Sequence, residues 1–180
     1  YGDTGWGDEL FFATLMTIAV ATAAIFIGFV LAAIFASFKL SKIKALNLLT
    51  WNRLDVAFKL YFLEMLGNGV MFSHKMYIDH ISAFSFGKFT EPGNKNKRGA
   101  KKFLEYFLDT FRDIEKNGFD KRRSLIPLSI NCSIANGSHR LASAIFLDKD
   151  IYGVKIKTNN HIYDYNFFYK RKISFETLDS

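Results

Sequence analysis

Residues 136–140 (NGSHR) place a glycine directly before the start of a helical pattern. A glycine at this position lets the backbone come close to a ligand, and the first N–H groups of a helix have no partner within the helix. These donors and the helix dipole attract phosphate. Arg140 adds a planar fork for phosphate oxygens, and two neighbouring side chains add donors. The pattern predicts phosphate binding by Asn136, Gly137, Ser138, His139 and Arg140.

The same five residues fit a simpler interpretation, in which they only begin a helix. Asn136 or Ser138 would then be the N-cap, with His139 and Arg140 exposed. A solvent-facing arginine at a helix start contributes little to stability, so we expect the fold to survive replacement of Arg140. Taken alone, the five residues favour this simpler interpretation, and both stay open here.

Two carboxylates are candidates for a general base or a Mg²⁺ ligand. Glu91 stands in the polar, Gly/Pro-punctuated stretch 90–99, which we expect to be a loop, and Asp120 follows the turn at Gly118. The single cysteine, Cys132, excludes a disulfide framework and a multi-cysteine metal site. The histidines could hold a metal only by folding together, so no metal site is predicted.

Hydrophobic periodicity predicts a mixed α/β (α+β) domain over residues 51–180. Helical spacing of apolar residues predicts helices at about 53–66, 73–85, 100–117 and 138–147, with the aromatic stripes in the core. On the first helix the stripe leaves Asp55 and Lys59 off the apolar face. Short apolar runs predict strands at 124–128, where Pro127 favours a sheet edge, and at 151–156. A turn and a short strand are expected at 130–134, and a closing strand or lid at 161–171.

The charges are divided unevenly between two parts of the chain. The 180 residues hold 24 Lys+Arg against 17 Asp+Glu, a formal balance of +7. Residues 1–50 hold three charges of each sign, so the whole excess lies in residues 51–180. This contrast excludes one homogeneous soluble domain, and 49% hydrophobic residues exclude a disordered chain. A basic domain that binds polyanions without catalysis is therefore one interpretation.

Residues 10–38 form an uncharged run of 29 positions, which is long enough to cross a bilayer as a helix. A signal peptide has a shorter apolar region with basic residues before it. Here acidic residues precede the run, and Lys39, Lys42 and Lys44 follow it. Basic residues mark the cytoplasmic side of a span. We therefore expect a short extracytoplasmic N-terminus, one transmembrane helix within residues 1–50, and a cytoplasmic domain at 51–180.

The segment from Gly5-Trp6-Gly7-Asp8-Glu9-Leu10 to Phe38-Lys39-Leu40-Ser41-Lys42 resembles the start of a polar amino-acid ABC transporter permease. The resemblance covers about residues 1–49 and is strongest for histidine and opine uptake subunits. It implies a bacterial inner membrane location and contact with other transmembrane helices. Members of that family have several further spans, and no other uncharged run of membrane length follows here. A fragment or fusion of such a permease, without catalytic activity, is thus the alternative interpretation.

The series from Asn117-Gly118-Phe119-Asp120 through Ile126-Pro127-Leu128 to Gly137-Ser138-His139-Arg140 resembles the ParB/sulfiredoxin-like superfamily. The resemblance covers about residues 100–157 and implies that Gly137, His139 and Arg140 hold nucleotide phosphates. The expected cofactor is therefore a nucleoside di- or triphosphate with Mg²⁺. Sulfiredoxins carry their catalytic cysteine where this chain has Ser138, which argues against that redox chemistry. DNA is not an expected partner, because no DNA-reading region follows.

These observations favour a membrane-anchored domain that binds nucleotide phosphates. Phosphoryl transfer is a candidate activity, with Glu91 and Asp120 as the candidate catalytic residues. Whether the chain is an enzyme, and in which oligomeric state it exists, stay open at this point. We also expect residues 51–180 to fold cooperatively without the span, because a chain of this length with many aromatic residues can bury a core.

Overall fold

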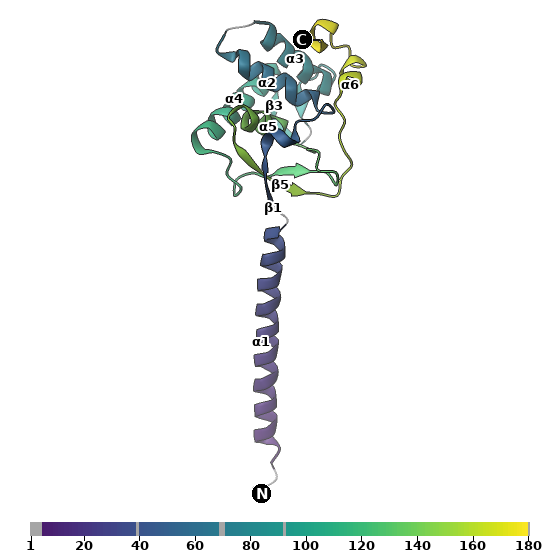
Figure 1. Ribbon diagram of the computed structural model, residues 1–180. Helices are drawn as coiled ribbons and strands as arrows, with labels where there is room; N and C mark the ends of the chain where they lie inside the picture. The colour runs from purple at the N-terminus through teal and green to yellow at the C-terminus, as the bar shows by residue number, and fades with distance from the viewer. Residues whose placement is uncertain (1–4, 39, 69–70, 92, 180) are drawn as a thin grey trace. The chain divides into compact units, whose positions relative to one another are not determined.

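The computed structural model describes residues 5–38, 40–68, 71–91 and 93–179. The chain divides into two compact units, Tyr1–Leu40 and Ser41–Ser180, which Figure 1 shows as a long helix and a mixed α/β domain. Lys39, one of the basic residues expected to follow the span, lies outside the described residues.

The first unit consists of helix α1 (Gly7–Phe38). Its part from Gly7 to Ala32 is long and apolar enough to cross a membrane, and large apolar side chains along it are exposed. The hydroxyl groups of Thr14, Thr17 and Thr22 donate to the carbonyl oxygens four residues earlier, at 2.7–2.8 Å. Polar groups in lipid need such internal partners. The predicted span is therefore present as one continuous helix.

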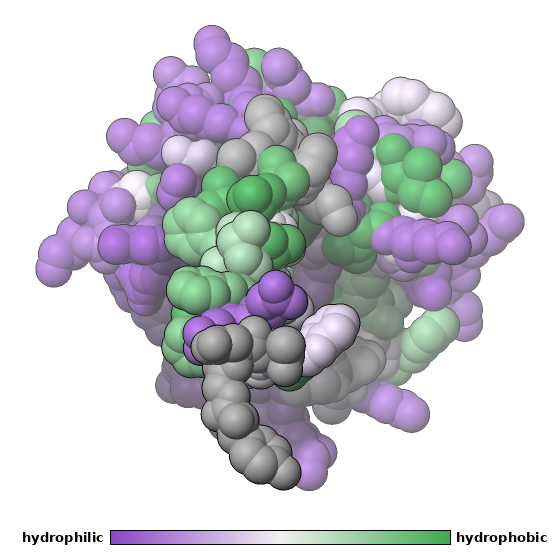
Figure 2. Space-filling model, turned by 90° about the horizontal axis from the view of Figure 1, so that it is seen from below, coloured by the Kyte–Doolittle hydropathy of each residue, from purple (hydrophilic) through white to green (hydrophobic). Residues whose placement is uncertain are grey.

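The second unit combines a small sheet with several helices (Figure 1). Hydrophilic residues cover most of its surface in the view of Figure 2. The helices predicted at 53–66, 73–85, 100–117 and 138–147 and the strands predicted at 124–128 and 151–156 are confirmed with small shifts at their ends. Its elements are β1 (Leu40–Lys44), the 3₁₀ helix η1 (Ala45–Leu48), α2 (Leu54–Leu66), α3 (Met71–Ser85), β2 (Thr90–Glu91), β3 (Asn94–Arg98), α4 (Ala100–Asn117), β4 (Ile126–Leu128), α5 (Ser138–Phe146), β5 (Asp150–Lys155), α6 (Tyr165–Tyr169) and α7 (Phe175–Leu178).

Three strands form the larger sheet, in the order β1-β5-β4. Strands β4 and β5 run parallel, with Ile126 paired with Gly153 and Leu128 with Lys155. Strand β4 lies at the edge, where the missing N–H of Pro127 is tolerated, as predicted. Parallel neighbours need a crossover connection, and here it contains α5. Residues 136–140 therefore lie where the chain leaves the edge strand and enters the crossover helix.

Helix α5 is at the centre of the packing, because α2, α4, η1 and β5 all contact it. Its inner residues Leu141, Ala142 and Ala144 have no exposed surface. Alanine lets neighbouring helices approach closely, and the aromatic residues predicted for the core fill the remaining space. The core around α5 also includes Phe62, Tyr77 and Phe107. The inner face of this helix is thus part of the core.

Three expectations about local structure are wrong. Residues 90–99 are not a loop, because β2 and β3 form an antiparallel hairpin with Thr90 opposite Arg98. The tail 161–171 contains helix α6 in place of a closing strand, begun by Asp164, whose side chain accepts from Phe167 N. The short strand expected within 130–134 is reduced to a single bridge between Leu128 and Ile134.

The compact unit also begins earlier than residue 51, the expected boundary. Strand β1 belongs to the three-stranded sheet, and Ala45 and Leu48 of η1 are 3% and 7% exposed within the core. This boundary could not be recognised in the sequence, because these residues follow the apolar run directly.

We predict that a fragment of residues 41–180 unfolds cooperatively, whereas a fragment of residues 51–180 is less stable by at least about 2 kcal/mol. The shorter fragment loses a sheet strand and the burial of Leu48, and burying one leucine contributes about 1.5–3 kcal/mol. Urea unfolding followed by circular dichroism would measure both free energies. Equal stabilities would show that β1 and η1 add nothing to the domain.

Candidate functional site

A cleft of about 570 Å³ opens in the second unit, a size typical of small-molecule sites. Residues from the start of α2, from α3, from the β2–β3 hairpin, from α4 and from the start of α5 line it. All five residues predicted to bind phosphate are among them, together with Glu91. The residues that line the cleft are Arg53, Asp55, Lys59, Ile81, Phe84, Ser85, Thr90, Glu91, Asn94, Lys97, Phe103, Tyr106, Thr110, Ala135, Asn136, Gly137, Ser138, His139, Arg140 and Tyr163.

Asp120 does not line this cleft. It lies between α4 and β4, accepts from Arg122 N at 2.8 Å and faces the Arg122 guanidinium at 3.3 Å. These hydrogen bonds lower the pKa of Asp120. It borders a separate cavity of about 140 Å³. Of the two carboxylates proposed from the sequence, the structure brings only Glu91 to the NGSHR segment.

Gly137 is the N-cap of α5 and has φ of 92°, in the left-handed region that favours glycine. The first intrahelical bond runs from Leu141 N to Gly137 O at 2.9 Å. A Cβ added at Gly137 would lie 2.8 Å from Arg140 Nη2 and 2.9 Å from Ile126 Cδ1. The glycine is therefore required by both its conformation and the side chains that cover it.

The Arg140 side chain folds back over Gly137 and is half-buried. Its Nη1 donates to Ser124 Oγ and, at 3.0 Å, to the carbonyl of Leu125. The expectation of a solvent-facing Arg140 is thus wrong. This arginine joins the start of α5 to the segment that leads into β4. It still borders the cleft and contributes positive charge there.

His139 points into the packing between α3 and α4. Its Nε2 lies 3.0 Å from Tyr77 Oη, and its ring stacks on Phe107 with centroids 4.7 Å apart. The Tyr77 hydroxyl donates to the carbonyl of Phe103, so His139 Nε2 is the donor in the other contact. Burial, and then the nearby charges of Lys59 and Lys97, lower the pKa of His139 well below its usual value. The histidine is therefore neutral near pH 7.

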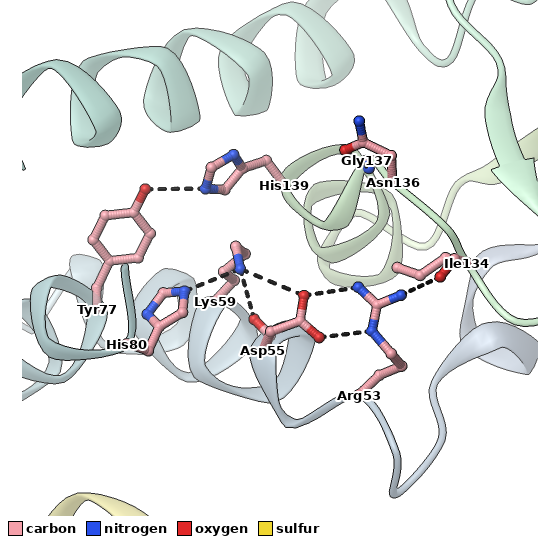
Figure 3. A network of polar contacts seen from close by, with 9 residues as sticks. All are labelled: Arg53, Asp55, Lys59, Tyr77, His80, Ile134, Asn136, Gly137 and His139. Carbon is pink, nitrogen blue, oxygen red and sulfur yellow. Dashed lines mark hydrogen bonds and ion pairs between the residues drawn. The ribbon is translucent and has the colours of Figure 1, made fainter. Parts of the chain in front are cut away.

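A buried ion pair that the sequence analysis missed forms one wall of the cleft (Figure 3). Arg53 Nε and Nη2 donate to the two carboxylate oxygens of Asp55 at 2.7 and 2.8 Å, and Nη1 donates to the carbonyl of Ile134. Both side chains are 2% exposed. Burial acts to raise the pKa of Asp55, but hydrogen bonds from Arg53 and the charge of Lys59 outweigh it and hold this pKa below its usual value.

Lys59 lies one turn further along α2 and is 1% exposed. Its Nζ donates to the carbonyl of Asp55 at 2.8 Å and lies 3.0 Å from His80 Nε2 (Figure 3). Burial lowers the pKa of Lys59 to about 8, although the Asp55 charge opposes the shift. Burial, and then the Lys59 charge, also lower the pKa of His80, so His80 is neutral and accepts the bond from Lys59.

Lys97 of β3 brings another cation to the cleft. Its Nζ pairs with Glu91 Oε2 at 2.8 Å and lies 4.5 Å from the centre of the Phe103 ring. Such a contact holds a cation at a ring face. The hairpin that replaces the expected loop therefore positions both Lys97 and Glu91.

The buried polar residues of α2 had a weak signal in the sequence. Asp55 and Lys59 are four residues apart, a spacing that usually marks an exposed ion pair on a helix. Here the apolar residues Phe58 and Phe62 and this polar pair are all buried, because α2 is covered from several sides. The full burial of the helix could have been suspected only from the high proportion of apolar residues in 53–66.

We predict that Gly137→Ala destabilises the chain by about 1–3 kcal/mol more than Gly87→Ala. Both glycines have positive φ, but nothing lies within 4 Å of a Cβ at Gly87. The two variants therefore share the backbone strain, and the difference measures the overpacking against Arg140 and Ile126. Urea unfolding of the full chain in a non-ionic detergent would supply both values. Equal losses would show that Arg140 moves aside without penalty.

Comparison with known proteins covers only part of the chain. No family model matches it, and no solved structure matches it. The chain is similar to the nopaline transport system permease protein NocQ of Agrobacterium fabrum, with 45% identity over 49 residues, which are 27% of this chain and 21% of the permease. The chain thus spans about a fifth of that permease. The length of the match agrees with the permease-like segment at residues 1–49, and the likeness to ParB stays a prediction from the NGSHR segment.

Proposed function

We propose that the second unit binds phosphate groups of a nucleotide or another phosphorylated small molecule in the cleft. The observation that carries this proposal is the charge of the lining residues. Arg53, Lys59, Lys97 and Arg140 line the cleft against two carboxylates, Asp55 and Glu91, and the start of α5 opens onto it. Such a concave, positively charged site focuses the field and attracts anions.

Lys97 and the first turn of α5 are the groups that we assign to the phosphate. The N–H groups there have no intrahelical partners and point along the helix dipole. Arg53 already forms a bidentate ion pair with Asp55. Its charge therefore adds to the positive potential of the cleft, but its guanidinium is not free to bind a phosphate with two hydrogen bonds. Aromatic side chains of Phe84, Tyr106 and Tyr163 also line the cleft and offer faces on which a nucleobase can stack.

The cleft does not fit a protein-bound Mg²⁺. Asp55 faces Arg53 and Lys59, and Glu91 faces Lys97, so each carboxylate is neutralised by a cation. Among the described residues no three acidic, histidine or cysteine side chains gather as a metal site. Magnesium ligation and base catalysis by Glu91 would both require this carboxylate to leave Lys97. We therefore propose binding of the phosphates and not phosphoryl transfer.

We predict that Lys97→Met weakens binding of inorganic pyrophosphate, measured without divalent metal by calorimetry on the full chain in a non-ionic detergent. Loss of a charged hydrogen bond of about 1.5–3 kcal/mol corresponds to roughly 10–150-fold in affinity. Lys95→Met, on the exposed part of the same strand, is the matched control and should change affinity little. Glu91→Gln should tighten pyrophosphate binding, because it removes the carboxylate that forms an ion pair with Lys97 and competes with the phosphate.

Two results would contradict this proposal. One is the absence of pyrophosphate and ATP binding by the unchanged chain at millimolar concentration. The other is equal weakening by Lys97→Met and Lys95→Met, which would indicate attraction to the basic surface in general. Residues 136–140 would then only begin α5 and pack against its neighbours.

For the first unit we propose membrane insertion and contact with other transmembrane helices. Its similarity to a transport permease and the exposed apolar surface of α1 support this role. Because the match covers a small part of the permease, transport itself is not proposed. Acidic residues begin α1, with Asp8 and Glu9 in its first turn, and Lys42 and Lys44 follow it. By the charge rule for spans, the second unit is on the cytoplasmic side.

We predict that a protease added to intact spheroplasts leaves the second unit undigested, since the membrane shields it. Permeabilised spheroplasts are the control and should lose it. An antibody tag placed after residue 180 would report the intact domain on a blot. Digestion in intact spheroplasts would place the second unit on the outer side.

A further inference from the structure

Lys59 is a buried amine without a carboxylate of its own. Its Nζ is 3.9 Å from Asp55 Oδ2, but both oxygens of that carboxylate already accept from Arg53 at 2.7 and 2.8 Å. The two groups within hydrogen-bond distance of its Nζ are neutral, namely the carbonyl of Asp55 and the imidazole of His80. A lysine that served only to neutralise Asp55 would be redundant here. Burying such a cation costs free energy, and neutralising Asp55 does not explain why Lys59 lies at the cleft.

Burial is the largest influence on the pKa of this amine, and it favours the unprotonated form. Arg53 precedes α2, Lys97 comes from β3, and both act to lower the pKa of Lys59, whereas Asp55 acts to raise it. The neutral histidines His80 of α3 and His139 of α5 supply no counter-charge. With a pKa of about 8, about a tenth of Lys59 carries a free lone pair at pH 7, and about half at pH 8. An exposed lysine, with a pKa near 10.4, has far less.

We propose that Lys59 is a covalent attachment site, at which its amine forms a Schiff base with a phosphorylated aldehyde or ketone. The proposal rests on the proposed function for the phosphate end of the ligand, which Lys97 and the start of α5 would hold in the same cleft. Buried lysines are the residues that proteins use for this chemistry. A ligand that carries both a phosphate and a carbonyl group would thus find both of its partners in one cleft.

The step balances without a further reactant. The Nζ lone pair attacks the carbonyl carbon, and the electron pair of the carbon–oxygen π bond moves to oxygen. The nitrogen loses a proton and the oxygen gains one, which gives a carbinolamine. Loss of water then forms the carbon–nitrogen double bond. The overall change is amine plus carbonyl compound to imine plus one water molecule, and addition of water reverses it.

Pyridoxal 5′-phosphate is a suitable probe because it joins an aldehyde to a phosphate. The full chain in non-ionic detergent is treated with limiting probe and sodium cyanoborohydride, which delivers hydride to the imine carbon and fixes the adduct as a secondary amine. Peptide mass spectrometry then locates the label. We expect labelling of Lys59 to exceed that of each exposed lysine by about tenfold or more near pH 7, because more of its amine is unprotonated.

The matched probe is pyridoxal, which has the aldehyde without the phosphate. It should label Lys59 more slowly, and Lys97→Met should slow the phosphorylated probe alone. The variant Lys59→Met should lower total labelling to that of the exposed lysines, whereas Lys75→Met, an exposed lysine of α3, should remove only its own label. Site mapping on the unchanged chain needs no variant, so misfolding of Lys59→Met cannot hide the result.

The outcomes separate the two proposals. If the label lies on exposed lysines and Lys59 stays unmodified, the covalent site is overturned whatever the chain binds. If Lys59 is labelled equally by both probes and Lys97→Met has no effect, the reactive amine stands and the phosphate site fails. Preferential labelling of Lys59 that depends on the phosphate and on Lys97 supports both.

Discussion

The Arg53 guanidinium links three parts of the second unit that are distant in sequence. It holds Asp55 at the start of α2, donates its third hydrogen bond to the carbonyl of Ile134 just before the NGSHR segment, and lies 5.0 Å from the Tyr163 ring of the tail. Removing one partner of a buried ion pair typically destabilises a protein by about 3–5 kcal/mol, because the other charge stays buried. The cleft, α2 and the tail therefore depend on one side chain.

The position of α5 follows from this link and from Arg140. Arg53 fixes the chain before the helix, Arg140 ties its first turn back to Ser124 and Leu125, and Gly137 provides the turn between them. Tyr77 and Phe107 hold His139 from the other side. The first turn of α5 is thus held rigidly at the cleft. In a preformed site of this kind, ligand binding loses little conformational entropy, because the binding groups are already ordered.

Much of the fold could be predicted because its longer elements have strong periodicity. The stripe of α4 with Phe103, Phe107 and Ile114 ends at Gly118, and the structure confirms those bounds. The hairpin at 90–99 could not be recognised, because its residues are polar and show no hydrophobic pattern. It is held by a tertiary contact, in which Lys97 packs on the Phe103 ring. Helices α6 and α7 are short and begin at side-chain caps, which leave little hydrophobic signal.

The candidate site was predictable in part for the same physical reason. Residues 136–140 carry a local signal, because a glycine before a helix has a defined conformational role. The burial of Arg53, Asp55 and Lys59 has no local signal, since it is decided by elements far along the chain, and the spacing of Asp55 and Lys59 alone indicates only an ion pair on a helix. Long-range packing also explains why Arg140, expected to be exposed, is half-buried and bound to the carbonyl of Leu125. Sequence patterns report local preferences, and the charge content of a cleft is a tertiary property.

The contact between Lys59 and His80 has a consequence for how the amine is held. Two nitrogen bases 3.0 Å apart share a hydrogen bond as long as either one carries a proton toward the other. A lysine paired with a carboxylate loses most of its attraction on deprotonation. An amine still has two N–H bonds after losing its proton, so Lys59 can keep donating to the imidazole. The Lys59 side chain therefore keeps the same conformation in both charge states, so the amine stays in place when it loses its proton.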